Sequence, residues 1–428
     1  MSYTPDIEKQ SLHTITEYQT RRLRETLAYL AAHSPYYQQL FDTHKINIEA
    51  IKSIEDLRQI PTTSKDDFNV RNEEFLCVPK NKIADYCTTS GTTGKPSVIA
   101  LTQKDIERLA YNEYVSFACA DGKAGDVFQL MLTLDRQFMA GMAYYTGIHR
   151  LEATTIRTGP GSPQLQWESI ERFKPTTLVT VPSFLLKMIE YAEANGISLN
   201  GSSVKKAVCI GESIRTLDFA DNALAERIKE KWNIQLYSTY ASSEMQTAFT
   251  ECGQGAGGHH HPELIIVEIL DEAGNPLAAG EYGEVTITTL GVEGMPLLRY
   301  RTGDICAYYD EPCTCGRTTI RLSPVKGRKN QMIKYKGTTL YPPAIAEALS
   351  TVAEIQDYII EVSKNDIETD EVVIHICQNG NHDLTERKIK SILQSKIRVL
   401  PSLNFVSSAY IQEKRPQNMR KPSTVVFS

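Results

Sequence analysis

A short segment, TSGTTGKP at residues 89–96, carries the residue types that bind phosphate. Small hydroxyl side chains, two glycines and one lysine favour a loop over the interior of a helix or strand. Backbone N–H groups, hydroxyls and an ammonium group can all point toward a phosphate chain from such a loop. The segment is not a G-x-x-x-x-G-K-[ST] loop, because Thr89 stands in place of the first glycine and Pro96 follows Lys95. These residues alone leave both a phosphate-binding loop and an ordinary surface turn open.

A second group of residues has the types that bind zinc. Cys313 and Cys315 follow a Glu-Pro turn, and about sixty residues earlier Cys252 precedes three adjacent histidines at 259–261. Three thiols and one imidazole are a common tetrahedral set for Zn²⁺. The C-x-C spacing is less common than C-x₂-C, and adjacent histidines also suit a polar loop. The pattern alone therefore leaves a zinc site and a polar loop open.

The elements that must position these residues alternate between strand and helix from about Asp85 to Tyr240. Strand-like runs occur at 127–133, 176–181 and 206–211. The segment 182–196 reads as a helix, because it begins with proline and ends with Asn-Gly. This alternation predicts α/β layers built on parallel strands. The first 75 residues are expected to be mainly helical, with leucines at helical spacing at 23, 27 and 30.

Beyond Tyr240 the pattern changes to short strands separated by turns, which predicts a barrel-like β subdomain. Its strands are expected at 264–270, 283–290 and 303–309. We therefore predict a large N-terminal domain over 1–326, a hinge at 327–330, and a small mobile α+β domain over 331–428. The small domain should contain helices near 342–351 and 384–398, and strands near 357–363, 371–378 and 403–411.

Composition limits the class of protein. The 428-residue chain, with 41% hydrophobic and 23% charged residues, reads as a globular protein of two or three domains. A net charge of -6 gives no reason to expect nucleic acid or an anionic membrane as a partner. No secretory signal or long apolar run is evident, so we expect a cytoplasmic protein.

Five further segments follow the phosphate loop in order: GES (211–213), YASSE (240–244), RYRTGD (299–304), GRKNQMIKYKG (327–337) and KRPQNMRKP (414–422). In this order and spacing they resemble the core motifs of the adenylate-forming superfamily of acyl-CoA synthetases. PLLRYRTGD and EPCTCGR are similar to segments of its phenylacetate–CoA ligase branch. The resemblance covers essentially the whole chain. It implies that a carboxylate attacks the α-phosphate of ATP to give an acyl-adenylate, and that the thiol of coenzyme A then releases AMP.

The resemblance also implies roles in nucleotide binding. The phosphate loop would use Ser90, Gly91, Thr92, Thr93 and Gly94, with Lys95 offsetting the charge of the leaving pyrophosphate. Adenine would lie near Tyr240, Ala241, Ser242 and Ser243, and the adenine and acyl sites would be lined by Gly211, Glu212 and Ser213. Glu244 would bind Mg²⁺, Asp304 would accept the ribose hydroxyls, and Arg328 would contact the ribose and phosphate side.

The catalytic lysine of the small domain is best matched by Lys421, with Lys414 as the runner-up. The chain departs from the family pattern here, because Arg420 stands where glycine is usual and Thr424 where arginine is usual. A solvated basic tail therefore stays open. The hinge also departs, with Asn330 and Gln331 where acidic residues are usual, which puts a charge-based switch in doubt.

The acyl pocket and the zinc ligands complete the assignment. Aromatic and apolar walls would come from Phe138, Met142, Tyr144 and Tyr145, which suit a flat ring, although ordinary core is an equal alternative. The branch's Gly-x-His pattern selects His260, with His259 as the alternative, as the fourth ligand beside Cys252, Cys313 and Cys315. A full ligand set would make this zinc structural.

Three functions remain open. The first is a CoA ligase for an aryl or arylacetic acid, with phenylacetate as the default substrate. The second is an adenylating enzyme that loads a carrier protein or another acceptor. The third is a non-catalytic nucleotide-binding homologue. The expected small molecules are the carboxylic acid, ATP, Mg²⁺ and coenzyme A, and a homodimer stays open.

Overall fold

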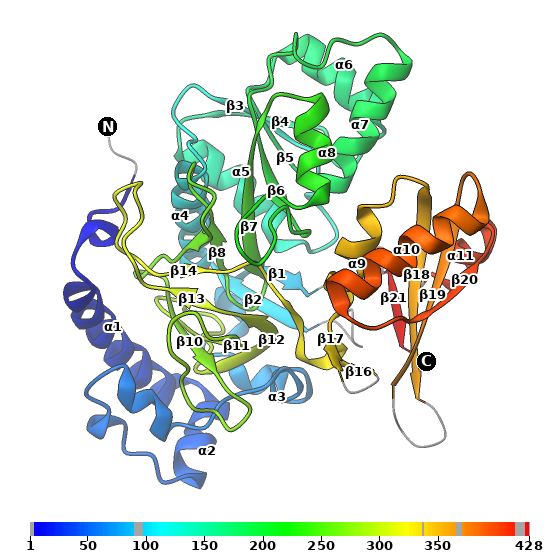
Figure 1. Ribbon diagram of the computed structural model, residues 1–428. Coiled ribbons are helices and arrows are strands. Elements are labelled where there is room, and N and C mark those ends of the chain that lie inside the picture. Colours follow the sequence, from blue (N-terminus) through cyan, green and yellow to red (C-terminus); the bar gives the residue numbers. More distant parts are fainter. Residues whose placement is uncertain (1–3, 90–96, 336–337, 365–369, 416–423, 428) are drawn as a thin grey trace. The chain divides into compact units, whose positions relative to one another are not determined.

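The computed structural model describes residues 4–89, 97–335, 338–364, 370–415 and 424–427 (Figure 1). The chain divides into two compact units. The larger unit holds most of the chain up to Pro324, and the smaller holds Gly303–Ile305 and most of the chain from Val325 onward. The predicted hinge at 327–330 falls on a short strand and a 3₁₀ turn, and rotation about it stays a prediction.

The larger unit begins with helices, which confirms the prediction from leucine spacing. Helix α1 (Leu12–His33) buries Leu23, Leu27 and Leu30 along one side. Ser34 ends α1 and its hydroxyl accepts a hydrogen bond from the Tyr37 N–H, which caps α2. The other helical elements of this region are η1 (Asp6–Lys9), α2 (Pro35–Thr43), η2 (Ile48–Ala50), η3 (Glu55–Gln59), α3 (Lys65–Val70), η4 (Asn72–Phe75) and η5 (Lys80–Lys82).

A nine-stranded sheet forms the centre of the larger unit, in the order β13-β14-β9-β8-β7-β6-β5-β3-β4. The strands from β4 to β7 pair in parallel, and those from β7 to β13 pair antiparallel. The parallel part confirms the predicted α/β layer. The strands are β3 (Val127–Leu130), β4 (Thr154–Arg157), β5 (Thr177–Thr180), β6 (Lys206–Ile210), β7 (Gln235–Ser242), β8 (Thr247–Thr250), β9 (Gly258–His259), β13 (Tyr308–Tyr309) and β14 (Arg321–Leu322).

Helices cover both faces of this sheet. Successive residues of a strand point to opposite sides, so neighbouring residues pack in different clusters. Leu178 and Leu236 pack with Trp167 and Trp232 in one cluster, whereas the neighbouring Val179 packs in another cluster with α4 and α5. Two-sided burial explains why these strands read as continuous apolar runs. The covering helices are α4 (Gln103–Cys119), α5 (Met139–Arg150), α6 (Pro163–Phe173), α7 (Pro182–Ala194) and α8 (Ala223–Lys231).

The predicted barrel-like subdomain is an open sheet. Within the described residues its order is β10-β11-β12-β15, and the first and last strands do not pair with each other. Its strands are β10 (Ile265–Leu270), β11 (Gly283–Thr289), β12 (Tyr300–Cys306) and β15 (Gly327–Arg328). A separate antiparallel pair, β1 (Ile83–Thr88) and β2 (Val98–Thr102), flanks the phosphate-loop segment.

The smaller unit is an α+β structure built on a four-stranded sheet of order β20-β19-β18-β21. Ile345, Leu349, Ile389 and Leu393 of its two longer helices pack on the sheet. Its elements are η6 (Lys329–Gln331), β16 (Ile333–Tyr335), β17 (Thr338–Leu340), α9 (Pro342–Ser350), β18 (Ile355–Lys364), β19 (Asp370–Gln378), α10 (His382–Ile397), β20 (Ser402–Phe405), α11 (Ser408–Lys414) and β21 (Val425–Phe427).

The predicted strand at 403–411 is wrong in its second half, where the chain forms α11. Ser407 explains the change, because its hydroxyl accepts a hydrogen bond from the Tyr410 N–H and starts a helix. In the described part of the chain, no helix combines the length and the apolar composition needed to cross a membrane.

Glu113 on α4 is a buried acid, and its burial raises the pKa of its carboxyl to about 8. Its neighbour Asn112 donates a hydrogen bond to Oε1 at 2.9 Å. Between the ordinary pKa of 4.5 and about 8, the folded state keeps a proton that the unfolded state has released. Stability should therefore fall as the pH rises through this window.

We expect the Glu113→Gln variant, which stays neutral, to escape this loss. Its free energy of unfolding should equal that of the wild type near about pH 5 and exceed it by on the order of 1–3 kcal/mol near about pH 9. Urea unfolding of both proteins at each pH measures the difference. A difference that is the same at both pH values would contradict the raised pKa.

Candidate functional site

The YASSE segment lies on the hairpin between β7 and β8. Ser242 pairs with Thr247, so residues 243–246 form the loop and Glu244 is its second residue. The Tyr240 ring, predicted to lie near adenine, stacks on the Phe249 ring at 6.0 Å between centroids. This places the predicted adenine and magnesium residues, Tyr240 to Glu244, on one continuous hairpin.

A lysine that the sequence analysis missed lies beside Glu244. The Lys65 Nζ is 3.9 Å from Glu244 Oε1. Lys65 is the first residue of α3, directly after Ser64, whose side chain forms a capping box with Asp67. Ser64 and Asp67 indicate from sequence where α3 begins. The contact of Lys65 with Glu244 could not be predicted in this way, because it joins segments far apart in the chain.

The residues present fit a magnesium ion completed by phosphate. Mg²⁺ is usually held by one or two carboxylates together with waters and substrate phosphates. Glu244 offers such a carboxylate, and its distance to the Lys65 ammonium is longer than that of a charge-assisted hydrogen bond. Glu244 is therefore the residue of this hairpin suited to hold the ion.

The GES segment forms a turn directly after β6. Gly211 has a φ of 76°, a value that favours glycine. Glu212 accepts hydrogen bonds from the Ser183 N–H and Oγ, both at 2.9 Å. Ser213 Oγ donates to the Arg215 carbonyl at 2.9 Å. The contacts of Glu212 join the segment to the beginning of α7.

Asp304 and Arg328, both predicted to contact the ribose, are neighbours in the smaller unit. They face each other in the register of β12 and β15, and Arg328 Nε donates to Asp304 Oδ1 at 3.1 Å. The Asp304 side chain is nearly buried, whereas that of Arg328 is 44% exposed. The structure thus brings together two residues that the sequence placed 24 positions apart.

The phosphate-loop residues Ser90–Lys95 and the lysine at 421 lie outside the described residues. Thr89 and Ser97, which flank the loop, exchange two hydrogen bonds. The Thr89 N–H donates to the Ser97 carbonyl at 3.0 Å, and the Ser97 N–H donates to Thr89 Oγ1 at 3.0 Å. The ends of the loop are therefore held side by side.

Lys414, the runner-up for the catalytic lysine, is engaged in an ion pair. Its Nζ lies 2.6 Å from Glu361 Oε1, and the hydrogen bond from Lys414 lowers the pKa of that carboxyl. Glu361 also lies 2.7 Å from His375 Nε2. This local network favours a structural role for Lys414.

The residues predicted to line the acyl pocket do not share one face of α5. Tyr144 is a correction, because it is buried in the core against Phe117, with ring centroids 5.5 Å apart. Phe138 precedes α5 and, like Tyr145, packs against the same core cluster as Tyr144. Met142 is instead 46% exposed. The Arg157 guanidinium lies 5.3 Å from the ring centroid of Tyr145.

Three thiols and one imidazole gather at one end of the large sheet. The donor atoms of Cys252, His259, Cys313 and Cys315 all lie within 4.8 Å of one another. The Cys252 and Cys313 sulfurs are 3.7 Å apart, and Cys315 Sγ is 3.5 Å from His259 Nε2. A tetrahedral zinc with Zn–S bonds of about 2.3 Å would separate two sulfurs by about 3.8 Å. The cluster therefore fits zinc in both composition and spacing.

Two thiols of this cluster have their pKa values shifted in opposite directions, because the hydrogen bond to Cys315 and burial raise the pKa of the Cys252 thiol. Hydrogen bonds from Cys252, His259 and Arg317 lower the pKa of the Cys315 thiol. Burial lowers the pKa of His259, which keeps its imidazole neutral. Thiolate and neutral imidazole are the forms that bind zinc.

His259, and not His260, faces the sulfurs, which corrects the preferred ligand. The two residues are adjacent on extended chain, so their side chains point in opposite directions. His260 Nε2 instead lies 2.6 Å from the Ile265 carbonyl, and its ring stacks on Phe249. His261 Nδ1 lies 2.6 Å from Oε1 of the buried Glu8.

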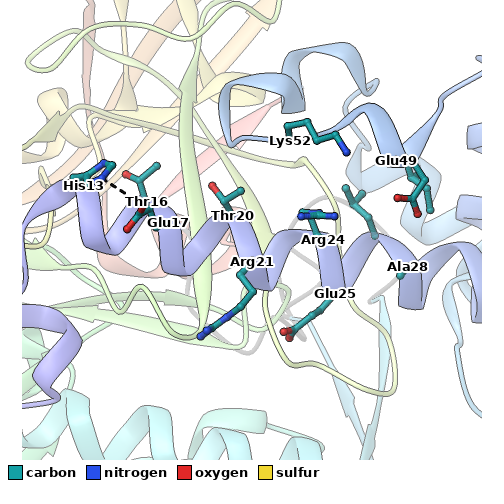
Figure 2. Close-up of a pocket in the computed structure, with 12 residues that line it drawn as sticks. His13, Thr16, Glu17, Thr20, Arg21, Arg24, Glu25, Ala28, Glu49 and Lys52 are labelled. Carbon is teal, nitrogen blue, oxygen red and sulfur yellow. Dashed lines mark ion pairs between the residues drawn. The ribbon is translucent and has the colours of Figure 1, made fainter.

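A hollow of about 700 Å³ lies along α1 and η2 (Figure 2). Figure 2 shows charges of both signs along it, including Arg21, Arg24, Glu25 and Lys52. Of the described residues predicted to bind nucleotide, acid or metal, none lines this hollow. It is therefore separate from the candidate active site.

Comparisons with known proteins identify the family of this chain. The sequence profile of the AMP-binding enzyme family matches residues 21–294. A phenylacetate–coenzyme A ligase of Escherichia coli K12 is 30% identical over 84% of this chain and 81% of its own length. One from Thermus thermophilus is 29% identical over 88% of this chain and 84% of its own length.

A solved structure shares the fold. The structure of a 2-hydroxyisobutyryl-CoA ligase in the postadenylation state, in complex with 2-HIB-AMP, has a TM-score of 0.87. It covers 100% of this chain and 93% of its own, at 20% identity. With the family profile over more than half of the chain and the motif residues in order on or directly after β6, β7, β12 and β15, this protein belongs to the AMP-binding enzyme family of adenylate-forming ligases.

Proposed function

We propose that this protein activates an aryl or arylacetic acid with ATP and transfers the acyl group to coenzyme A, with phenylacetate as the default acid. The observation that carries the proposal is that relatives named phenylacetate–coenzyme A ligase align along most of the chain. The apolar side chains of Phe138 and Met142, at the start of α5, suit a flat, apolar acid.

The roles of the protein's own residues are binding and orientation. Asp304 accepts hydrogen bonds from the ribose hydroxyls, and its contact with Arg328 keeps the carboxylate in place. Tyr240 provides a flat surface for adenine. Glu244 holds Mg²⁺, which when bound neutralises charge on the phosphates. Both half-reactions depend on positioning and charge stabilisation more than on acid–base chemistry.

Pyrophosphate exchange with a panel of carboxylic acids tests the first half-reaction. Exchange that depends on an arylacetic acid is expected, and exchange with none of the acids would favour a non-catalytic homologue. Adding coenzyme A and measuring acyl-thioester by chromatography tests the second half. Adenylation without thioester would indicate a carrier protein or another acceptor.

A structural zinc ion bound by Cys252, His259, Cys313 and Cys315 is the second part of the proposal. The spacing of the four donor atoms supports it. Gly316, with a φ of 91°, closes the turn that carries both Cys313 and Cys315. Because four protein ligands fill a tetrahedron, such an ion would leave no position for substrate.

Asp304→Ala and Glu244→Ala should both weaken the use of nucleotide, but by separate routes. Asp304 acts on the ribose, whereas Glu244 acts through the metal. We expect each variant to lose on the order of 10–100-fold in kcat/KM for ATP, and excess Mg²⁺ to restore part of the activity of Glu244→Ala only. Magnesium titrations of the two variants provide the measurement. The same response in both would show that the roles are misassigned.

A further inference from the structure

Arg108 on α4 is a buried cation whose hydrogen bonds end on three backbone carbonyls, each next to the end of a different strand, and on one side-chain hydroxyl. Arg108 is 8% exposed. Its Nη1 donates to the Gln246 carbonyl at 2.7 Å, and its Nη2 donates to Thr247 Oγ1 at 3.3 Å. Its Nε donates to the Leu290 carbonyl at 2.7 Å, and Nη2 also donates to the Leu264 carbonyl at 2.5 Å. A planar guanidinium is suited to several acceptors at fixed angles.

These acceptors lie where strands of two sheets end. Gln246 precedes β8 of the nine-stranded sheet. Leu264 precedes β10, and Leu290 follows β11, both in the four-stranded sheet. Arg108 therefore fixes the hairpin loop of residues 243–246 against the neighbouring sheet. Figure 1 shows α4 and β8 close together, and hydrogen bonds join them.

The hairpin loop needs such support at Gln246. Its φ of 50° lies in the left-handed region, which residues other than glycine, asparagine and aspartate rarely occupy. The Gln246 side chain is 2% exposed and its Oε1 has no hydrogen-bond partner among the described residues. The backbone carbonyl of Gln246, by contrast, accepts a hydrogen bond from Arg108, and this bond holds the peptide group between Gln246 and Thr247. Glu244 lies two residues earlier in the same loop.

A row of polar residues on α4 continues this contact along β8. Asn112, one turn after Arg108, accepts a hydrogen bond from the Ala248 N–H at 3.0 Å. Ser116 Oγ lies 2.5 Å from Thr250 Oγ1. These contacts hold the body of β8, whereas Arg108 holds the loop itself. Asn112 is therefore a matched control, because it is buried on the same face of α4 and its hydrogen bond to the sheet goes to Ala248 of β8, not to the loop.

We propose that Arg108 is a positioning residue that fixes the left-handed turn at Gln246 and so places the Glu244 carboxylate for the metal–nucleotide complex. This rests on the proposed role of Glu244. Arg108 acts through the backbone of the loop and does not touch the nucleotide. Burial lowers the pKa of its guanidinium only to about 10, so Arg108 remains charged at neutral pH.

The test compares Arg108→Lys with Asn112→Ala. A lysine ammonium cannot reach acceptors on three strands in the planar arrangement of a guanidinium. Binding of Mn²⁺, as a spectroscopic substitute for Mg²⁺, is measured by electron paramagnetic resonance with α,β-methylene-ATP. Thermal unfolding of both variants provides the comparison of stability.

We expect Arg108→Lys to weaken Mn²⁺ binding by on the order of tenfold, as loss of an outer-shell support commonly does. Asn112→Ala should lower the thermal stability about as much as Arg108→Lys does. Its Mn²⁺ binding should stay within about twofold of that of the wild type. Replacing Gln246 with glycine in the Arg108→Lys background should recover part of the affinity, because glycine adopts a positive φ without strain. Equal Mn²⁺ affinity in Arg108→Lys and Asn112→Ala would overturn the proposal.

Two further outcomes are decisive. If Arg108→Lys does not fold, Thr247→Val removes only the bond to Nη2. That variant should weaken Mn²⁺ binding by about threefold, and an unchanged affinity would contradict the role of Arg108. If the wild type shows no nucleotide-dependent Mn²⁺ binding, or if Glu244→Ala binds Mn²⁺ normally, the role of Glu244 is wrong and the inference about Arg108 is lost with it.

Discussion

Replacing Lys421 with alanine is expected to abolish formation of the acyl-adenylate while leaving thiolysis of a supplied acyl-adenylate largely intact. A lysine carried by the small domain would stabilise negative charge on the α-phosphate and the departing pyrophosphate during the first half-reaction. Loss of one such group costs on the order of 10²–10³-fold in rate. The second half-reaction does not need it, because the small domain is predicted to rotate before the thiol enters. Pyrophosphate exchange and single-turnover thioester formation measure the two steps separately.

Lys414→Ala is the control for Lys421→Ala. Lys414 pairs with Glu361 at 2.6 Å, and its side chain is 32% exposed. Removing a partly exposed ion pair typically costs on the order of 1 kcal/mol or less. Both half-reactions should therefore keep about the wild-type rate in Lys414→Ala. Loss of adenylation in Lys414→Ala with normal rates in Lys421→Ala would make Lys414 the catalytic lysine. Equal loss of both half-reactions in Lys421→Ala would show that Lys421 does not act in adenylation alone.

Helices and parallel strands were predictable from sequence because their signals are local. Apolar runs such as the one containing Leu178 and Val179 belong to strands covered on both faces. Leu23, Leu27 and Leu30 recur at the spacing of one helix face. The GES and YASSE segments were also found from sequence, since GES forms the turn after β6 and YASSE lies at the end of β7.

The corrected residues depend on contacts between distant segments. Whether His259 or His260 faces the thiols depends on the register of the two-residue strand β9, which pairs with Thr250 and Arg321. Tyr144 is a core residue because α5 packs against Phe117 of α4, and an amphipathic pattern does not say which neighbour covers a face. The ion pair of Lys65 with Glu244 joins α3 to a loop in the central sheet, so neither residue alone predicts it.

Removing zinc is expected to lower the thermal stability of the protein more than it changes the chemistry. The purified protein should contain one zinc ion per chain, bound with sulfur–metal distances of about 2.3 Å that X-ray absorption measures. The ion would join three segments of chain, those that carry Cys252, His259, and the pair Cys313 and Cys315. Structural zinc contributes directly to folding, so chelation should lower the melting temperature by about 5–10 °C. At 25 °C the residual folded protein should keep its rate of adenylation.

Two matched pairs of variants separate zinc binding from ordinary packing. His259→Ala should lose the metal, whereas His260→Ala should keep it, because His260 is turned toward the Ile265 carbonyl. Cys313→Ser should lose the metal, whereas Cys119→Ser should keep it. The Cys119 thiol packs in the same cluster but donates to the Thr250 carbonyl at 3.2 Å. Metal analysis of the four proteins gives the answer. Zinc retained in His259→Ala and lost in His260→Ala would restore the original sequence assignment, and a protein isolated without chelator that contains no zinc would end the proposal of a metal site.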